Sequence, residues 1–201
     1  TQNQMTVVRG WSGGQNFEVT GEGYNPEGEF KRGETPVMPV LERSTALLLH
    51  GGLLCNDAKI EHVMTDDGKR VWRMVGDPTE GAMVVAAGKA GLWRNEVEQC
   101  LPRVAEIPFD SDRKCMTTIH PTDRWPEGPL GNGNDGNANG VGTPPFVAFV
   151  KGAPDIILSY CDNIAVNGHN EPLAPEMRRT VLDANKNMAS DALRVMAVAY
   201  R

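Results

Sequence analysis

The sequence lacks several features that would assign it to a common class of protein. No apolar run approaches the roughly 18 residues that a membrane-spanning helix needs. The first residues have neither the basic start nor the apolar stretch of a secretory signal, so we expect no leader. Positive charge is not in excess: 20 Lys and Arg against 26 Asp and Glu give a net charge of −6. This balance argues against binding to nucleic acid or to anionic membranes.

Thiols and imidazoles are also scarce. The 4 cysteines (Cys55, Cys100, Cys115 and Cys161) are far apart and form no C-x-x-C pair, and the 4 histidines lack the spacing of metal ligands. A chain of 201 residues can bury a substantial core without disulfides. We therefore expect reduced thiols, a cytosolic setting and no metal site.

Of two common nucleotide-binding motifs, one is absent and the other occurs outside the structural context that it requires. No G-x-x-x-x-G-K-[ST] sequence occurs, which excludes a P-loop nucleotide hydrolase. Gly131, Gly133 and Gly136 match G-x-G-x-x-G, but the strand before it and the helix after it that a dinucleotide site requires are absent. We interpret this match as chance. It lies in residues 126–145, a segment rich in Gly and Asn that we predict to be a flexible loop insert without a catalytic role.

The remaining composition, with 40% hydrophobic and 23% charged residues, is that of an ordinary globular protein. We expect a single domain over residues 1–201. Strand-like and helix-like segments are interspersed, and pairs of strand-like segments flank short polar turns, which indicates antiparallel hairpins. The sequence therefore predicts an α+β fold in which helices pack on a largely antiparallel sheet.

Apolar periodicity and turn residues give the expected elements. Asp77 or Thr79 would cap the helix predicted at residues 78–90. Residues 21–39, rich in Gly, Pro and Glu, are predicted to form an ordered surface loop. Helices are predicted at residues 40–54, 78–90, 96–101 and 175–190. Strands are predicted at residues 5–9, 15–19, 71–75, 104–108, 115–120, 146–150, 164–166 and 193–200.

Lys151-Gly152-Ala153-Pro154-Asp155 follows an apolar strand-like run and precedes a helix-like run. Pro154 suits the first position of a helix, because its missing N–H costs nothing there. Gly152 lets a ligand approach the backbone closely, and Lys151 can face an anion. The same residues are equally compatible with a plain strand end followed by a helix start, so on this segment alone both interpretations stay open.

Four other segments accompany this one in a fixed order. The five are Cys55-Asn56-Asp57-Ala58, Asp77-Pro78-Thr79-Glu80, Pro108-Phe109-Asp110-Ser111-Asp112-Arg113-Lys114-Cys115-Met116, Lys151-Gly152-Ala153-Pro154-Asp155 and Leu193-Arg194-Val195-Met196-Ala197. Together they resemble the ordered motifs of the nucleotide-binding (N) domain of P-type cation-transporting ATPases, in particular the type II, calcium-pump-like group. Each motif alone is weak, whereas five in the right order are specific.

The resemblance implies a sheet of six or seven antiparallel strands flanked by helical hairpins. It implies a domain on the cytosolic face of a membrane pump that holds ATP, or Mg-ATP in the whole pump, by its adenine. The domain would present the γ-phosphate to an aspartate of the phosphorylation domain. Its partners would be ATP or ADP and the phosphorylation and actuator domains. The alternative is a non-catalytic protein-interaction domain that keeps the fold without binding nucleotide.

The phosphorylation sequence Asp-Lys-Thr-Gly-Thr is absent from the chain. We therefore expect a monomeric domain from a longer pump, cut at both hinges, that binds nucleotide without turning it over and has no catalytic residue of its own.

Particular residues gain roles from the resemblance. Phe109 would stack on adenine, Glu80 would accept a hydrogen bond from the adenine amino group, and Met116 would form a wall of the pocket. Gly152 and Ala153 would belong to the same nucleotide-binding set. From the sequence alone, Phe109 and Met116 could instead be core residues, and Glu80 could simply favour the N-terminus of its helix.

The phosphate side depends on cations. Lys151 would line the adenine and phosphate side of the pocket, unless it is a solvated surface lysine. Arg194 interrupts an apolar run and would contact the phosphates, and its alternative is an ion pair with an acid such as Asp191. Ser111 is assigned to the site too, but it stands where some calcium pumps have a phosphate-contacting arginine. We therefore expect modest phosphate affinity.

Overall fold

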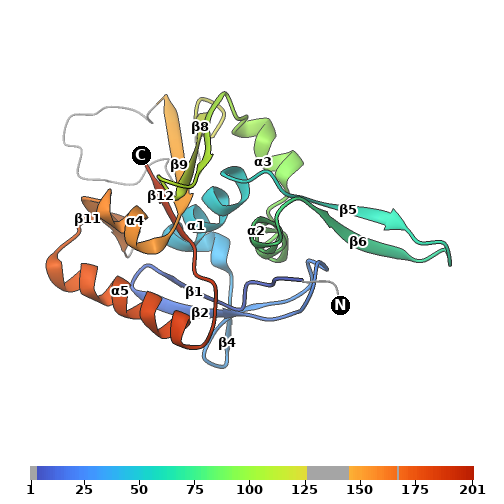
Figure 1. Cartoon of the computed structure of the whole chain (residues 1–201), viewed down its shortest axis with the longest axis horizontal. Helices are drawn as coiled ribbons and strands as arrows, with labels where there is room; N and C mark the ends of the chain where they lie inside the picture. The colour runs from blue at the N-terminus through green and yellow to red at the C-terminus, as the bar shows by residue number, and fades with distance from the viewer. Residues whose placement is uncertain (1–3, 126–144, 167) are drawn as a thin grey trace.

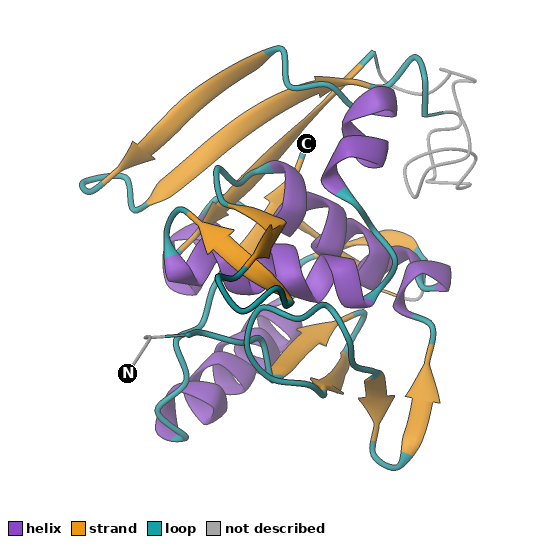
Figure 2. Ribbon diagram, turned by 90° about the vertical axis from the view of Figure 1, so that its right-hand side faces the viewer, coloured by secondary structure: helices purple, strands orange, loops and turns teal. Residues whose placement is uncertain are grey.

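The computed structural model describes residues 4–125, 145–166 and 168–201. The predicted loop at 126–145 lies, apart from Pro145, outside the described residues. Helices α1 (Arg43–Leu54) and α2 (Pro78–Lys89) lie between two four-stranded antiparallel sheets, as Figures 1 and 2 show. The protein therefore has an α+β architecture in layers, with the two helices in the middle.

The sheets are named here by their place in the chain. The N-terminal sheet has the order β1-β2-β3-β4, with β1 (Arg9–Ser12), β2 (Gln15–Val19), β3 (Phe30–Arg32) and β4 (Thr35–Val37). The C-terminal sheet has the order β12-β9-β8-β7, with β7 (Ala105–Asp110), β8 (Cys115–Pro121), β9 (Phe146–Gly152) and β12 (Ala197–Tyr200).

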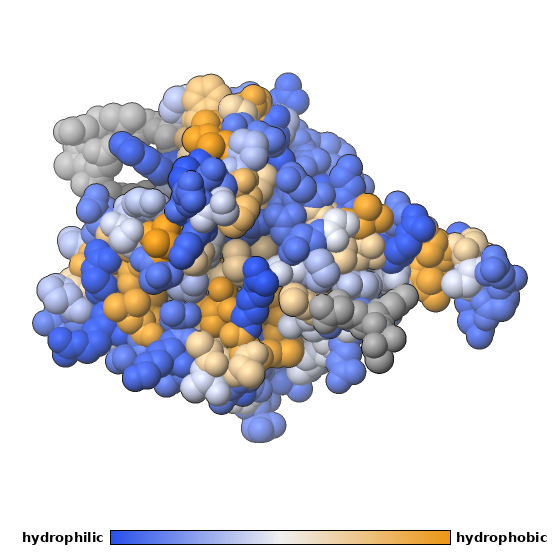
Figure 3. All heavy atoms as spheres, viewed as in Figure 1, coloured by the Kyte–Doolittle hydropathy of each residue, from blue (hydrophilic) through white to orange (hydrophobic). Residues whose placement is uncertain are grey.

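Two separate hairpins complete the strands of the described residues. One consists of β5 (Lys59–Met64) and β6 (Arg70–Val75) and projects from the body, with apolar side chains on its surface (Figures 1 and 3). The other consists of β10 (Asn163–Val166) and β11 (His169–Pro172). The remaining helices are a 3-10 turn (Pro39–Leu41), α3 (Arg94–Cys100), α4 (Pro154–Ser159) and α5 (Pro175–Ser190).

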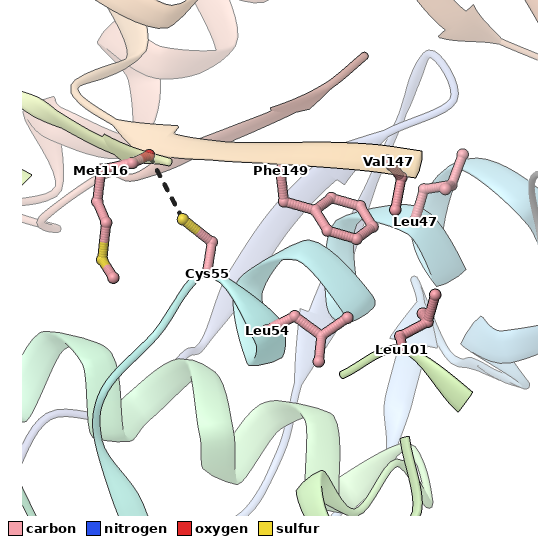
Figure 4. Packing of buried hydrophobic residues seen from close by; sticks show 7 residues of the cluster. All are labelled: Leu47, Leu54, Cys55, Leu101, Met116, Val147 and Phe149. Carbon is pink, nitrogen blue, oxygen red and sulfur yellow. Dashed lines mark hydrogen bonds between the residues drawn. The ribbon is translucent and has the colours of Figure 1, made fainter. Parts of the chain in front are cut away.

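Helix α1 packs in both directions, and nine of its twelve residues are buried. Toward the C-terminal sheet it contributes to a cluster drawn in Figure 4, which contains Leu47, Leu54, Cys55, Leu101, Met116, Val147 and Phe149. Toward the N-terminal sheet, Leu49 joins a second cluster with Phe17, Val19, Phe30 and Ala86 of α2. Because burial removes apolar surface from water on both sides, α1 is the central element of the core.

The close approach of α1 to the C-terminal sheet explains a glycine inside the helix. A Cβ on Gly51 would overlap the Val198 side chain and lie 2.8 Å from Cδ1 of Phe149. Any larger residue would push α1 away from the sheet. The Gly51-Gly52 pair therefore does not end the helix, despite the low helix propensity of glycine.

Most expected elements are confirmed. The helices expected at 78–90 and 175–190 form as α2 and α5, and Pro154 is the first residue of α4. The strand expected at 5–9 begins only at Arg9, as β1, and a turn at Gly13-Gly14 with positive φ at both glycines joins it to β2. The α+β class and the antiparallel pairing are confirmed as well. The strands differ in grouping, since the described residues form four sheets where the resemblance implies one of six or seven strands.

Other expected elements are corrected. Residues 21–39 are not only a loop, because β3 and β4 form a short hairpin there around Gly33, whose φ is +58. Strands β5 and β11 were not expected. The last strand begins at Ala197, so Arg194 precedes it instead of interrupting it. None of the helices in the described part of the chain has the length and apolar character needed to span a bilayer.

Candidate functional site

Glu80 and Lys151 meet in an ion pair between α2 and the C-terminal sheet. The Nζ atom of Lys151 lies 2.5 Å from Oε1 of Glu80, and the two side chains are 4% and 19% exposed. The other carboxylate oxygen, Oε2, accepts a hydrogen bond from the backbone N–H of Asp57 at 3.1 Å. Both oxygens of Glu80 are thus held by donors, and a carboxylate has lone pairs left for a third. The solvated-lysine alternative for Lys151 is not what the structure shows.

Asn56 connects the two central helices beside this pair. Its side chain is fully buried and donates to the carbonyls of Gly52 and Glu80, at 2.9 Å each, while its Oδ1 accepts from the N–H of Ala58 at 2.8 Å. The turn that follows α1 is therefore fixed to the first turn of α2. A buried polar side chain with all these bonds made specifies one arrangement of the helices.

Phe109 lies in a β-bulge. Ile107 pairs with Thr117 and Asp110 with Cys115, so Pro108 and Phe109 both face the single residue Met116. Proline cannot donate to the ladder, and a bulge is one of the few places in a strand that tolerates it. The side chain of Phe109 is 62% exposed, so it is not a core residue.

The row of neighbours across the sheet is informative. Met116 on β8 pairs with Lys151 on β9, and Lys151 pairs with Val198 on β12. Phe109 is thus separated from Lys151 by one strand. The backbone register brings the aromatic bulge and the Glu80–Lys151 pair to the same end of the C-terminal sheet.

The turn after Phe109 is held by Asp110. Its carboxylate accepts from the N–H groups of Asp112 and Arg113, at 2.9 and 2.8 Å, and these bonds hold the pKa of the Asp110 carboxyl below its ordinary value. Ser111 is exposed at this turn. Asp110 therefore fixes the loop that carries Ser111.

Protein atoms surround three further residues of the nucleotide-binding set, namely Met116, Gly152 and Ala153. Met116 is 2% exposed and belongs to the core cluster of Figure 4, where its carbonyl accepts from the Cys55 thiol at 3.4 Å. A Cβ on Gly152 would overlap the carbonyl oxygen of Lys114, so the space beside this glycine is filled by protein. Ala153 is the N-cap of α4 and donates to the same carbonyl at 3.3 Å.

Arg194 is exposed, and its positive charge is one of the influences that lower the pKa of the Asp77 carboxyl at the start of α2. Asp191, the acid considered as its partner, forms its ion pair with Arg9. The phosphate-contact interpretation of Arg194 thus stays a prediction.

Asp77 caps α2 by accepting from the N–H groups of Thr79 and Glu80, at 2.8 and 3.2 Å. Burial opposes its charge, but these hydrogen bonds outweigh burial and hold the pKa of the Asp77 carboxyl below its ordinary value. The stabilisation from the charged cap is therefore fully present above the unfolded pKa of about 3.9 and is lost as pH falls through the lower folded pKa.

We expect Asp77→Ala to lower the free energy of unfolding by about 1 kcal/mol near neutral pH. The difference from the wild type should narrow in urea titrations as pH falls below about 3.9 and through the lower folded pKa, because the carboxyl is then protonated first in the unfolded and then in the folded state. Asp77→Asn keeps an acceptor at the cap and should stay close to the wild type at neutral pH. A difference between wild type and Asp77→Ala that does not change with pH would contradict this assignment.

A cavity of 450 Å³ lies elsewhere, between the β1–β2 hairpin and α5. Its lining includes Trp11, Phe17 and Met188 and none of the eight residues assigned to nucleotide binding. The geometric hollow and the motif-bearing residues are therefore at different places on the molecule. The described residues contain no cluster of three or more His, Cys, Asp or Glu side chains that could hold a metal ion.

Two residues that hold the turn after α1, Asn56 and Arg103, were not given roles from the sequence. Asn56 stands in a recognised motif directly after an apolar helix, a position where a polar side chain can bond the last carbonyls. Arg103 gave no signal, because its acceptors Leu54, Asn56 and Asp57 are 46 to 49 residues away in the chain.

Comparison with known proteins agrees with these motifs. Residues 44–201 match the family described as P-type ATPase, cytoplasmic domain N. The whole chain is 35% identical to a calcium-transporting ATPase of Bacillus subtilis and 34% identical to the cation-transporting ATPase pma1 of Synechocystis, and it covers 20% of each. Over 98% of its length it is 36% identical to a probable cation-transporting ATPase F of Mycobacterium bovis, covering 19%.

The chain thus spans about a fifth of the length of these curated relatives. The family match covers most of the chain and includes every residue assigned to the site. The chain belongs to the family of the cytoplasmic N domain of P-type ATPases.

Proposed function

We propose that this chain is the ATP-binding domain of a cation-transporting P-type ATPase. It would hold ATP by its adenine and present the γ-phosphate to the aspartate of the pump's phosphorylation domain. The observation that carries the proposal is the Glu80 carboxylate, held on both oxygens by Lys151 and the Asp57 N–H at the end of the sheet that also bears exposed Phe109.

These residues suit adenine. An exposed aromatic ring offers a stacking surface worth about 1–3 kcal/mol per base. A fixed carboxylate accepts a hydrogen bond from an exocyclic amino group and repels a carbonyl at the same place. Because the Lys151 ammonium is 2.5 Å from Glu80 and nearly buried, we infer that it acts on adenine through Glu80.

The phosphates would then depend on exposed Arg194 and on Mg²⁺ bound to the nucleotide. Ser111 adds a hydroxyl and no charge, which supports weak phosphate binding by the domain alone. In the whole pump, positioning and charge neutralisation by Mg²⁺ and the phosphorylation domain would supply the rest. The names of the relatives support cations, and calcium among them, as the transported ions. The actuator domain is a further proposed partner, and the isolated chain is proposed to be a monomer that does not turn ATP over.

Titration with ATP, followed by calorimetry or amide chemical shifts, tests the proposal directly. We expect a saturable response at submillimolar to millimolar ATP, with shifts at Phe109 and at the turn after α1. A chain that shows no saturable response would instead be a non-catalytic interaction domain that keeps the fold.

Phe109→Ala should weaken ATP binding by about 1–3 kcal/mol, because it removes the stacking surface. It should leave the free energy of unfolding nearly unchanged, since the ring is 62% exposed. Phe146→Ala removes another exposed phenylalanine, 53% exposed at the opposite end of β9, and is the matched control. Equal ATP affinity in Phe109→Ala and the wild type would remove Phe109 from the site.

A further inference from the structure

Arg103 makes more hydrogen bonds than its exposed surroundings suggest. It stands between α3 and β7, and its side chain is 21% exposed. Its terminal nitrogen Nη2 donates to the carbonyls of Leu54 and Asn56, at 3.1 and 2.6 Å. The other terminal nitrogen, Nη1, donates to the carboxylates of Asp57 and Glu106, at 2.7 Å each. A planar fork can hold four acceptors in this way, and an ammonium cannot.

The four acceptors belong to two segments. Three are in the end of α1 and the turn after it, and Glu106 is in β7, the strand that continues to the bulge at Phe109. Burial opposes the guanidinium charge, but the hydrogen bonds to Asp57 and Glu106 outweigh burial and raise the pKa of Arg103. Arg103 therefore remains a cation that fixes the turn to β7.

That turn is the one that holds Glu80. The N–H of Asp57 donates to Oε2 of Glu80, and Asn56 donates to the Glu80 carbonyl. Arg103 bonds the carbonyl of Asn56, which belongs to the same peptide unit as the Asp57 N–H. The orientation of the N–H that orients the Glu80 carboxylate is thus set by a bond from Arg103.

We propose that Arg103 is a positioning residue that gives the site its preference for a 6-amino purine over a 6-oxo purine. This proposal rests on the nucleotide-binding function proposed above. With Arg103 in place, the Asp57 N–H and the Lys151 ammonium hold the Glu80 carboxylate in one orientation, ready to accept from the 6-amino group of adenine. Without it the peptide can rotate, the carboxylate loses one donor, and the contact with the amino group weakens.

The test compares ATP with ITP, whose base carries a carbonyl in place of the 6-amino group. We expect Arg103→Gln in the 201-residue chain to bind ATP about tenfold more weakly, the worth of one hydrogen bond to a charged group, while its affinity for ITP changes by less than about twofold. A merely structural role would lower both affinities together. Arg73→Gln, which removes an exposed guanidinium that pairs with Glu61, is the control and should leave both unchanged.

Asp57→Asn is the second variant, because it keeps the N–H to Glu80 and removes the ion pair with exposed Asp57. It should lower the ratio of ATP affinity to ITP affinity, as Arg103→Gln does, but by a smaller factor. If Arg103→Gln does not fold, this variant tests the proposal in its place. A preference equal to the wild type in the folded variants, or a parallel loss for both nucleotides, would overturn the proposal. A wild-type chain that binds ATP but does not prefer it to ITP overturns it too. Absence of ATP binding in the wild type is a different result and removes the proposed function.

Discussion

Glu80→Ala is expected to lower the free energy of unfolding by about 3–5 kcal/mol, the usual cost of removing one partner of a buried ion pair. The reason is the position of Lys151, whose side chain is 4% exposed and whose ammonium has Glu80 as its ion-pair partner among the described residues. Without the carboxylate, an ammonium would remain buried against the core with no charge to oppose its own. Urea unfolding at neutral pH measures the change.

The opposite substitution should cost less. Lys151→Met leaves Glu80 charged, but that side chain is 19% exposed and keeps the hydrogen bond from the Asp57 N–H. The double variant, Glu80→Ala with Lys151→Met, buries no unpaired charge and should be more stable than Glu80→Ala alone. This order separates the cost of an orphaned charge from the net contribution of the pair.

Glu61→Ala is the matched control for the pair. Glu61 forms an ion pair with Arg73 across the β5–β6 hairpin, where both side chains are about half exposed. Surface pairs contribute about 0–1 kcal/mol, so this variant should be close to the wild type. If Glu80→Ala also lay within that range, Lys151 would have to reach water or another acceptor, and the assignment of a buried pair would be wrong.

Local signals in the sequence were sufficient for the helices. Asp77 followed by Pro78 is a cap and a first helical residue, and α2 begins at that point. Pro154 marks the start of α4 for the same reason. These signals depend on neighbouring residues alone, which is why they could be read without knowledge of the fold.

The strands depended more on tertiary contacts. β3 and β4 have three residues each, too few for an alternating pattern, and β5 carries charged residues because most of its residues face water. β12 was expected to begin at residue 193, but the strand begins only where Ala197 pairs with Gly152. The division into separate sheets likewise follows from which edges meet, and no local pattern encodes that.

The site residues likewise divide into those whose position could be predicted and those whose position depends on tertiary contacts. The exposure of Phe109 was expected from the family motif, because the residues around it alone also allowed a core position. The Lys151–Glu80 pair could not be predicted, because its members are 71 residues apart and an isolated lysine is usually solvated. Met116 was considered as a pocket wall, and this stays a prediction: its side chain is buried in the core cluster, as is that of its neighbour Cys115, so simple strand alternation did not indicate its position.

Gly152 illustrates how the fold itself uses a residue that the sequence assigned to ligand approach. It pairs with Cys115 on β8 and Ala197 on β12, and the Lys114 carbonyl, where φ is +52, lies directly beside its Cα. A Cβ there would overlap that carbonyl oxygen and lie 2.8 Å from the Cys115 Cβ. These neighbours are backbone and a buried side chain, so neither can move without separating β8 from β9.

We therefore expect Gly152→Ala to lower the free energy of unfolding by about 3 kcal/mol, at the upper end of the usual cost of overpacking. It should also weaken ATP binding, because Lys151 precedes it and the turn after Phe109 adjoins it. Gly52→Ala is the control. Gly52 lies inside α1, its Cβ would lie 3.8 Å from Met83 of α2, and the added helix propensity should make this variant equally stable or more stable by about 0.5–1 kcal/mol. If urea unfolding gave the two alanine variants the same stability, β8 and β9 would be able to move apart at this end, and the fixed end of the sheet on which Phe109, Lys151 and Glu80 depend would not be rigid.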